Sequence, residues 1–177
     1  GGFVPLAPNV MIDGPAPPLA PATLSRDADG GATIRAVRVN APLRLDGALD
    51  EAVYEDVAPV GGFIQQVPNN GAASTEQTDV WVFYDDENIY VAARCWDSEP
   101  DSLVANDMRR DSFQIIRNDN FQVVFDTFYD RRNGVGFMVN PIGGFFDYQI
   151  TDESRPNSDW NPVWDRRTGR FDGGWTV

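Results

Sequence analysis

Residues 118–150 read NDNFQVVFDTFYDRRNGVGFMVNPIGGFFDYQI and hold the densest run of β-strand signals in the chain. Apolar and polar side chains alternate over 121–126, which is the two-residue period of a half-buried strand. The Asn-Gly pair at 133–134 favours a hairpin turn, because both residue types adopt positive φ at little cost. Strand-like runs return at 135–139 and 145–150, so this stretch predicts a three-stranded antiparallel meander at the centre of the domain.

Working outward, a second hairpin is predicted on the N-terminal side of the meander. Two β-rich runs, 75–84 and 89–97, flank the acidic loop 85–88. A first strand of moderate quality is expected within 33–39, and the run 171–177 is entering a strand where the sequence stops. A strand that ends unpaired leaves an open edge, so we expect the domain to be truncated at its C-terminal strands.

Shorter elements are expected between these strands. Asp50 is placed to cap a short helix that would bury Tyr54 and its apolar neighbours. A short strand is expected at 63–66, a polar connecting loop with one helical turn at 98–117, and a turn at 166–170. The many short strands predict an all-β fold.

The first 33 residues differ in composition from the rest of the chain. Repeated Pro, Ala and Gly favour extended polyproline II and keep this segment out of a sheet interior. We therefore expect an extended arm, residues 1–33, followed by a β-sandwich domain, residues 34–177. The arm is expected to lie against its own domain or, as the favoured alternative, against a protein partner. Its candidate partner-binding residues are Phe3, Val4, Leu6, Val10, Met11 and Ile12.

Charge and residue usage exclude several classes of function. The 177-residue chain, long enough for one domain with a core, carries a net charge of −13. Such an acidic surface repels phosphate backbones and anionic lipid, so no nucleic-acid partner is expected. The chain contains no His, which excludes Ser-His-Asp catalysis and His-ligated zinc or haem within it.

Cysteine usage and hydropathy add two expectations. Cys95 is the only cysteine, so no internal disulfide can form, and its strand context predicts a buried structural thiol. No apolar run reaches the roughly 18 residues that a membrane-spanning helix needs, so no transmembrane span is expected.

Four motifs, at 45–51, 78–91, 119–126 and 173–177, carry a resemblance to a known family. In their order and spacing the chain resembles a family 9 carbohydrate-binding module. It is most similar to the version found at the N-terminus of bacterial envelope proteins in which an outer-membrane-type β-barrel region of unknown function follows. The resemblance implies an antiparallel β-sandwich, export to the periplasm or outer envelope, no catalysis and, in some members, bound calcium.

The sugar site of that family carries over less completely than its fold. Sugar-binding members hold the saccharide in an aromatic clamp with one Trp just ahead of the strand that matches 121–126. Ile116 stands nearest that position here, and Gln122 and Met138 replace the polar partners of the family. The resemblance therefore supports the fold more strongly than it supports a sugar ligand.

Acidic and aromatic clusters supply three candidate sites. Calcium prefers hard oxygen ligands, and four carboxylates flank the loop between two strands, namely Asp97, Asp101, Asp107 and Asp119. Trp160 and Trp164 form an exposed-looking pair that could stack on sugars, anchor a partner or pack locally. Asp126 and Asp147 are expected on neighbouring strands, where they could form a glycosidase-like pair.

Three functions follow from these features. The first is a non-catalytic interaction or accessory subunit on the periplasmic or outer face of a bacterial membrane complex, held to other protein subunits through its arm. A relative of this fold carries haem in periplasmic oxidoreductases, so an electron-transfer assembly, respiratory or photosynthetic, is one candidate host by analogy alone. The alternative is a carbohydrate-binding module for an envelope or plant polysaccharide, and the third is a glycoside hydrolase. We expect no enzyme activity.

Overall fold

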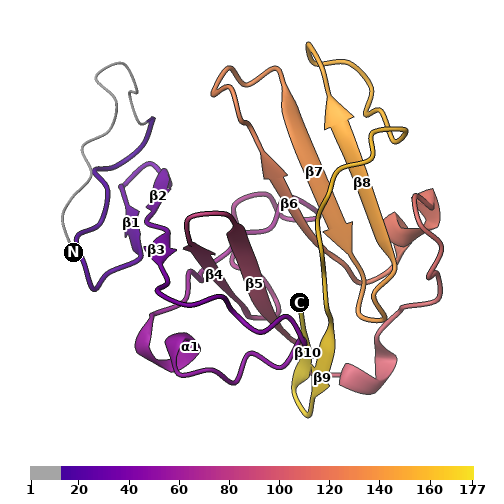
Figure 1. Ribbon diagram of the computed structural model, residues 1–177, viewed down its shortest axis with the longest axis horizontal. Coiled ribbons are helices and arrows are strands. Elements are labelled where there is room, and N and C mark those ends of the chain that lie inside the picture. The colour runs from indigo at the N-terminus through magenta and orange to yellow at the C-terminus, as the bar shows by residue number, and fades with distance from the viewer. Residues whose placement is uncertain (1–12) are drawn as a thin grey trace.

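The chain is built mainly from β-strands, as predicted. A computed structural model describes residues 13–177 and arranges the strands in three sheets (Figure 1). A two-stranded sheet pairs β1 (Leu24–Arg26) with β2 (Ala32–Ile34). A five-stranded sheet has the order β3 (Val37–Arg38), β4 (Thr78–Tyr84), β5 (Ile89–Trp96), β10 (Gly174–Thr176), β9 (Gly169–Phe171). A three-stranded sheet has the order β6 (Phe121–Phe125), β7 (Gly134–Val139), β8 (Phe145–Ile150).

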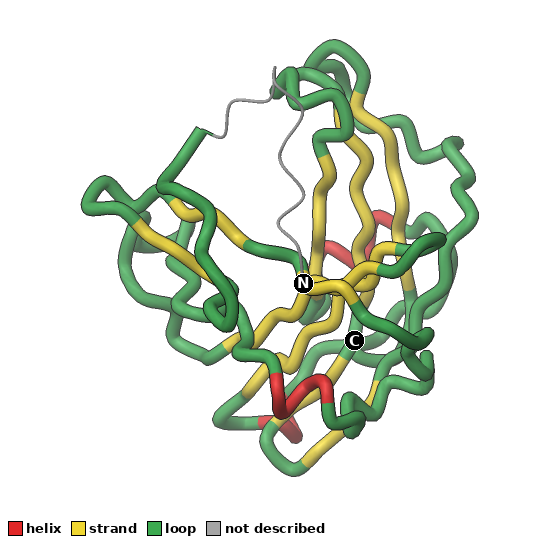
Figure 2. The backbone as a smooth tube through the Cα atoms, turned by 60° about the vertical axis from the view of Figure 1, so that its left-hand side comes forward, coloured by secondary structure: helices red, strands yellow, loops and turns green. Residues whose placement is uncertain are grey.

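Helix is scarce in the part of the chain that the structure describes. It is confined to α1 (Val53–Asp56) and two 3₁₀ segments, η1 (Pro100–Ser102) and η2 (Phe113–Arg117) (Figure 2). The predicted helical cap is wrong, because α1 begins after Ala52 without a side-chain cap, and Asp50 instead pairs with Arg44.

The predicted meander is confirmed in its strand order, and the structure gives its register. Phe121 of β6 lies opposite Val139 of β7, which in turn lies opposite Phe145 of β8. The turn chemistry differs from the prediction, because positive φ falls at Tyr129 and Arg131 rather than at Asn-Gly. The loop is instead organised by a carboxylate just after β6 that accepts several backbone N–H groups, as in an Asx turn.

The second predicted hairpin is also confirmed, but the chain's last strand is not an edge. β4 and β5 pair antiparallel, and β10 lies between β5 and β9 with partners on both sides. Part of 166–170, expected to be a turn, belongs to β9, and the β9–β10 turn falls at Asp172-Gly173. β3 pairs with β4 in parallel, so the five-stranded sheet is mixed rather than purely antiparallel. The run 63–66 forms only an isolated bridge at Ile64.

Each face of the five-stranded sheet carries its own apolar cluster. On one face Tyr54 of α1 packs edge-on against Trp81 and Phe83 of β4, at ring-centroid distances of 5.4 and 5.6 Å. On the other face Val80 and its buried neighbours contact Phe121 of β6. This second cluster joins the five-stranded sheet to the three-stranded sheet.

The described part of the Pro-rich segment lies on the chain's own first hairpin. The hydroxyl of Thr33 donates to the Pro15 carbonyl at 2.6 Å, and the hydroxyl of Ser25 donates to the Ala16 carbonyl at 2.6 Å. The predicted domain boundary after residue 33 therefore falls inside β2, whose hydrogen-bonding partner is β1. The expected partner-binding residues, all within 1–12, lie outside the described residues.

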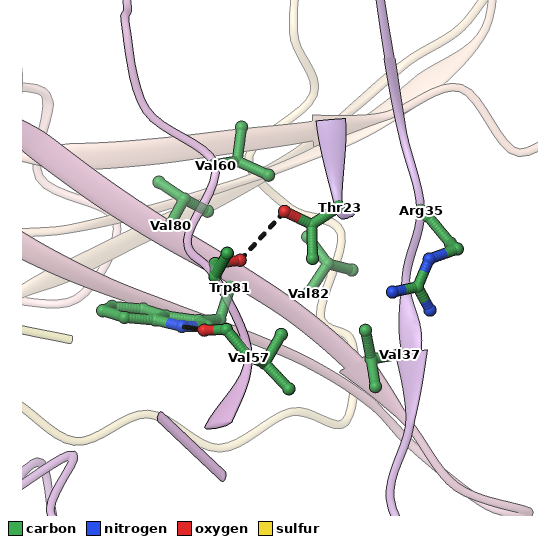
Figure 3. A pocket seen from close by; sticks show the side chains of 9 residues that line it. Thr23, Arg35, Val37, Val57, Val60, Val80, Trp81 and Val82 are labelled. Carbon is green, nitrogen blue, oxygen red and sulfur yellow. Dashed lines mark hydrogen bonds between the residues drawn. The ribbon is translucent and has the colours of Figure 1, made fainter. Parts of the chain in front are cut away.

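The β1–β2 hairpin and the five-stranded sheet are joined through the segment that follows α1, residues 57–58. Thr23 donates its hydroxyl to the Ala58 carbonyl at 2.9 Å, and the Trp81 indole donates to the Val57 carbonyl at 2.9 Å (Figure 3). The gap between these groups has no volume that a water-sized molecule could fill, so it is a packing contact rather than a ligand site.

Candidate functional site

One face of β7 and β8 collects aromatic and polar side chains. The antiparallel register places Phe137 opposite Asp147 and Val139 opposite Phe145, so these residues share a face. The alternate residues of β8 point to the opposite face, where Phe146 joins a separate buried cluster. Asp147 lies on this face between Phe145 and Gln149 of the same strand.

A segment without strand structure, residues 159–168, crosses this face between β8 and β9 (Figure 1); we call it the tryptophan strap. Trp164 lies 4.9 Å from the Phe137 ring and 5.6 Å from the Phe145 ring, while Trp160 lies 5.8 Å from Phe137. The structure thus brings the two predicted tryptophans together over one phenylalanine. Both rings are half-buried rather than fully exposed, because each packs on the sheet.

Asp147 is completely buried beneath the strap. One carboxylate oxygen accepts the indole N–H of Trp164 at 3.1 Å and lies 3.6 Å from the Arg110 guanidinium. The other oxygen has no hydrogen-bond partner among residues 13–177. A buried carboxylate is costly unless charged or hydrogen-bonding groups surround it, and Trp164 and Arg110 are the groups that contact this one.

Two arginines complete the cluster. Arg110 forms a 3.0 Å ion pair with Asp111, donates a hydrogen bond to the Asn161 side chain, and lies 5.4 Å above the Phe145 ring. Arg166 lies above the same ring at 3.4 Å, a cation–π contact. Burial lowers the pKa of Arg166 below its usual value.

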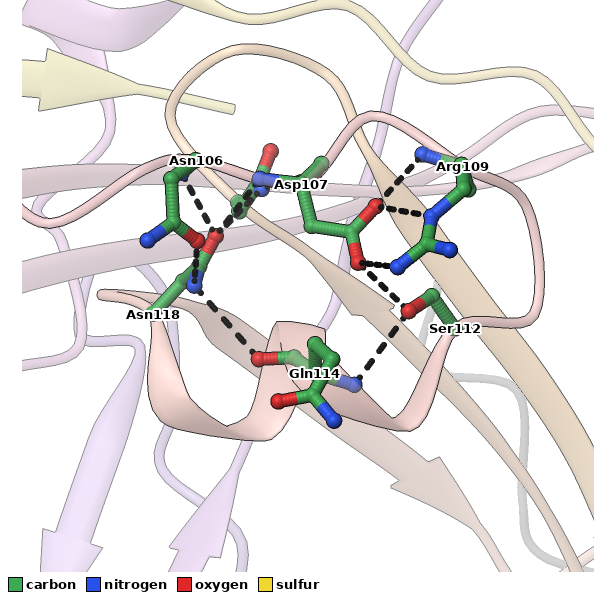
Figure 4. Close-up of polar contacts among 7 residues, drawn as sticks. Asn106, Asp107, Arg109, Ser112, Gln114 and Asn118 are labelled. Atoms are coloured by element: carbon green, nitrogen blue, oxygen red, sulfur yellow. Dashed lines mark hydrogen bonds and ion pairs between the residues drawn. The ribbon is translucent and has the colours of Figure 1, made fainter.

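The loop that carries Arg110 is fixed by buried amides that the sequence did not single out. The Asn118 side-chain oxygen accepts the backbone N–H of Asn106 and the amide of Asn140, each at 3.0 Å (Figure 4 shows Asn106 and Asn118). Asn140, fully buried, also donates to the Asp107 carbonyl at 2.7 Å. The Asn-Pro pair at 140–141 indicates a turn after β7 but does not by itself indicate these contacts.

The four aspartates predicted to bind calcium are not brought together. Asp107 is buried and engaged by Arg109 at 2.8 Å and by Ser112 at 2.6 Å (Figure 4), and the hydrogen bond from Arg109 holds the pKa of Asp107 well below its usual range. Asp119 accepts the Val104 N–H at 2.6 Å, and Asp97 accepts a backbone N–H in its own turn. Across residues 13–177, no group of three or more His, Cys, Asp or Glu is placed to hold a metal ion, and Asp101 joins no such group.

The glycosidase-like pair is not on neighbouring strands, contrary to expectation. Asp126 follows β6 and Asp147 lies in β8, and β7 separates these two strands. Asp126 accepts the backbone N–H of Arg131 at 2.7 Å and so organises a turn. Asp147 is occupied by Trp164 and Arg110, as described above.

The position that matches the family clamp is open to solvent. Ile116 is 53 % exposed, and Gln122 donates a hydrogen bond to the Tyr148 hydroxyl. Met138, the other replaced polar position, is buried in the cluster behind the sheet. No aromatic clamp is formed by these residues.

An open cleft of about 650 Å³ lies beside the β4–β5 turn, between Tyr84, Ile89 and Phe125. Its rim is acidic: Asp85 accepts the Tyr90 hydroxyl at 2.7 Å, Asp86 pairs with an arginine, and the Glu87 carboxylate has no ion pair or side-chain hydrogen bond within residues 13–177.

We call Trp160 and Trp164, with the neighbouring Asn161, Arg110 and Arg166, the strap site. It combines flat apolar rings with polar groups, which is the chemistry that recognises a sugar. An aromatic ring packs against the C–H face of a pyranose, while amide and guanidinium groups bond its hydroxyls. Asn161 is exposed beside the two tryptophans, and its amide nitrogen is free of the contact that its oxygen makes with Arg110. Within residues 13–177, no helix is both long and apolar enough to span a membrane. Comparison with known proteins adds no assignment, because no protein-family model, curated protein or solved structure matches this chain.

Proposed function

We propose that this chain is a non-catalytic saccharide-binding domain whose stacking platform is formed by Trp160 and Trp164. In this proposal Asp147 is a positioning residue, because it fixes the Trp164 ring and the Arg110 guanidinium without touching the ligand. The arrangement would be a β-sandwich, supported by the apolar contact of Phe121 in β6 with the buried residues of the five-stranded sheet.

The observation that carries the proposal is the burial of the Asp147 carboxylate under the two-tryptophan strap. A strand residue that served packing alone would be apolar at a completely buried position, since an unpaired carboxylate oxygen is costly there. Asp147 instead orients one aromatic group and one cationic group at the rim of the site. Fixing these groups before the ligand arrives reduces the entropy lost on binding.

The accessory-subunit function remains a separate prediction. Its candidate residues lie within 1–12, outside the described residues. The next part of the arm, at Pro15 and Ala16, accepts hydrogen bonds from the β1–β2 hairpin of the same chain. The described residues therefore favour saccharide binding over partner binding through the arm. An exported location in a bacterial envelope fits an envelope polysaccharide as ligand and stays an expectation.

Calorimetric titration tests the proposal directly. The chain is titrated with gluco-oligosaccharides, xylo-oligosaccharides and peptidoglycan fragments, and we expect at least one class to release binding heat. Substituting Trp160→Ala or Trp164→Ala is expected to weaken that binding about tenfold or more, since tryptophans dominate such contacts. Trp96→Ala is the matched control, because Trp96 is 39 % exposed and lies in the other sheet.

Two results contradict the proposal. One is an absence of binding heat for every saccharide class with a folded protein. The other is binding that Trp96→Ala weakens as much as the two strap substitutions do.

A further inference from the structure

The Arg166 guanidinium, unlike that of Arg110, makes no polar contact within residues 13–177. It forms no ion pair and no side-chain hydrogen bond within residues 13–177, and its Nε atom is buried without a partner. Arg110 differs, since it already contacts Asp111, Asn161 and Asp147. A half-buried cation without a counter-ion is poorly solvated, which favours an added anion beside it.

The ring contacts of Arg166 fix the direction in which it can bind. Its guanidinium carbon lies 3.4 Å from the Phe145 ring centre and 5.6 Å from the Trp164 ring centre. The guanidinium is thus held between the Phe145 and Trp164 rings, and its terminal nitrogens are not among the buried unpartnered atoms. A planar guanidinium matches a planar carboxylate through two parallel hydrogen bonds.

Neighbouring charges leave Arg166 available. Asp165 precedes it in sequence but is bound by Arg167. Asp147 is buried and shared by Trp164 and Arg110. Neither carboxylate forms an ion pair or a hydrogen bond with the Arg166 guanidinium, although the second oxygen of Asp147 has no partner within residues 13–177.

We propose that Arg166 binds the carboxylate of an acidic saccharide, so that the ligand of the strap site contains a uronic acid. This inference rests on the proposed function. A uronic acid carries its carboxylate directly on the pyranose ring. A ring stacked on Trp164 therefore presents the carboxylate at the rim of the indole, where the Arg166 fork lies.

A methyl ester provides a matched ligand without the charge. The whole chain is titrated by calorimetry at neutral pH with trigalacturonate and with its fully methyl-esterified form, which has the same backbone. We expect the free acid to bind about tenfold tighter or more, the usual gain from a charge-assisted bidentate pair.

Substitutions assign the preference to one residue. Arg166→Gln is expected to abolish the preference for the acid while binding of the ester persists, and Arg166→Lys is expected to keep part of it, because the charge remains and the fork is lost. Arg167→Gln is the matched control, since Arg167 is exposed and adjacent in sequence. Thermal unfolding of each variant verifies that it is folded.

The outcomes separate this inference from the proposed function. Equal affinity for acid and ester in the unsubstituted chain, or a preference that survives Arg166→Gln, overturns the uronate assignment and leaves saccharide binding intact. If neither these ligands nor neutral oligosaccharides bind the folded chain, the proposed function fails and the uronate assignment fails with it.

Discussion

The indole N–H of Trp164 donates a 3.1 Å hydrogen bond to the completely buried carboxylate of Asp147. This bond ties the tryptophan strap to β8 and couples the orientation of an aromatic ring to a charge inside the protein. The same carboxylate faces Arg110, so one buried group organises both an aromatic and a cationic contact. The stability of the strap and its binding capacity should therefore change together.

Asp147→Ala is expected to lower the free energy of unfolding by about 1–3 kcal/mol, because it leaves the Trp164 indole N–H without its acceptor and removes the ion pair with Arg110. Asp147→Asn retains an acceptor oxygen of similar shape and should lose less. Urea denaturation measures both, provided that the denaturant slope stays constant. An alanine variant as stable as the unsubstituted chain would show that the bond does not hold the strap.

Phe83→Ala is expected to destabilise the chain by about 3–5 kcal/mol, because Phe83 is completely buried and its removal leaves a cavity. Phe128→Ala should change the stability by less than about 0.5 kcal/mol, since that side chain is 76 % exposed. Paired chemical denaturation of the two variants measures the difference. Equal losses would contradict the placement of the core beside β4.

Cys95 is expected to resist alkylation in the folded chain. Burial raises the pKa of its thiol to about 12, so the reactive thiolate is scarce at pH 8. Iodoacetamide labelling followed by mass spectrometry should be slow without denaturant and fast in guanidinium chloride. Cys95 is half-buried, and rapid labelling of the native chain would contradict the raised pKa of its thiol.

Asp85 should stabilise the β4–β5 turn in a defined pH range. A hydrogen bond from the Tyr90 hydroxyl and backbone N–H groups lower the pKa of Asp85 to about 2. Because the folded pKa is depressed, its contribution is present above the unfolded pKa of about 4 and is lost as the pH falls towards 2.

Tyr90→Phe removes the largest cause of that shift. The pKa of Asp85, followed by carboxyl-carbon NMR, is expected to rise towards its ordinary value in this variant, and the acid-side loss of stability should begin at higher pH. The distant substitution Tyr129→Phe serves as a control and should leave the Asp85 pKa unchanged. A pKa that does not move in Tyr90→Phe would rule out the hydroxyl as its cause.

Local sequence patterns predicted the strands but not how distant segments meet. Alternation over 121–126 and 145–150 was sufficient for the meander because the strand period is local. The insertion of β10 between β5 and β9 depends on contacts across about 80 residues, which no local pattern encodes. The β1–β2 hairpin was missed because its strands have three residues each and follow a Pro-rich segment.

The candidate site was foreseen only in its parts. Trp160 and Trp164 were recognised as an aromatic pair, whereas Asp147 was considered only as half of a glycosidase-like pair with Asp126. Their convergence, and the approach of Arg110 and Arg166, required the spatial path of the strap. The calcium prediction grouped aspartates by their position along one loop. In the structure Asp97 and Asp119 instead accept local backbone N–H groups, and Asp107 forms an ion pair.

The central claim is tested most directly by the indole N–H resonances of the chain's five tryptophans during titration with oligosaccharides. Saccharide binding at the strap is expected to shift the Trp160 and Trp164 resonances and to leave that of Trp96 unchanged. Shifts at Trp96 with the strap resonances unmoved, or no shift for any saccharide, would contradict it.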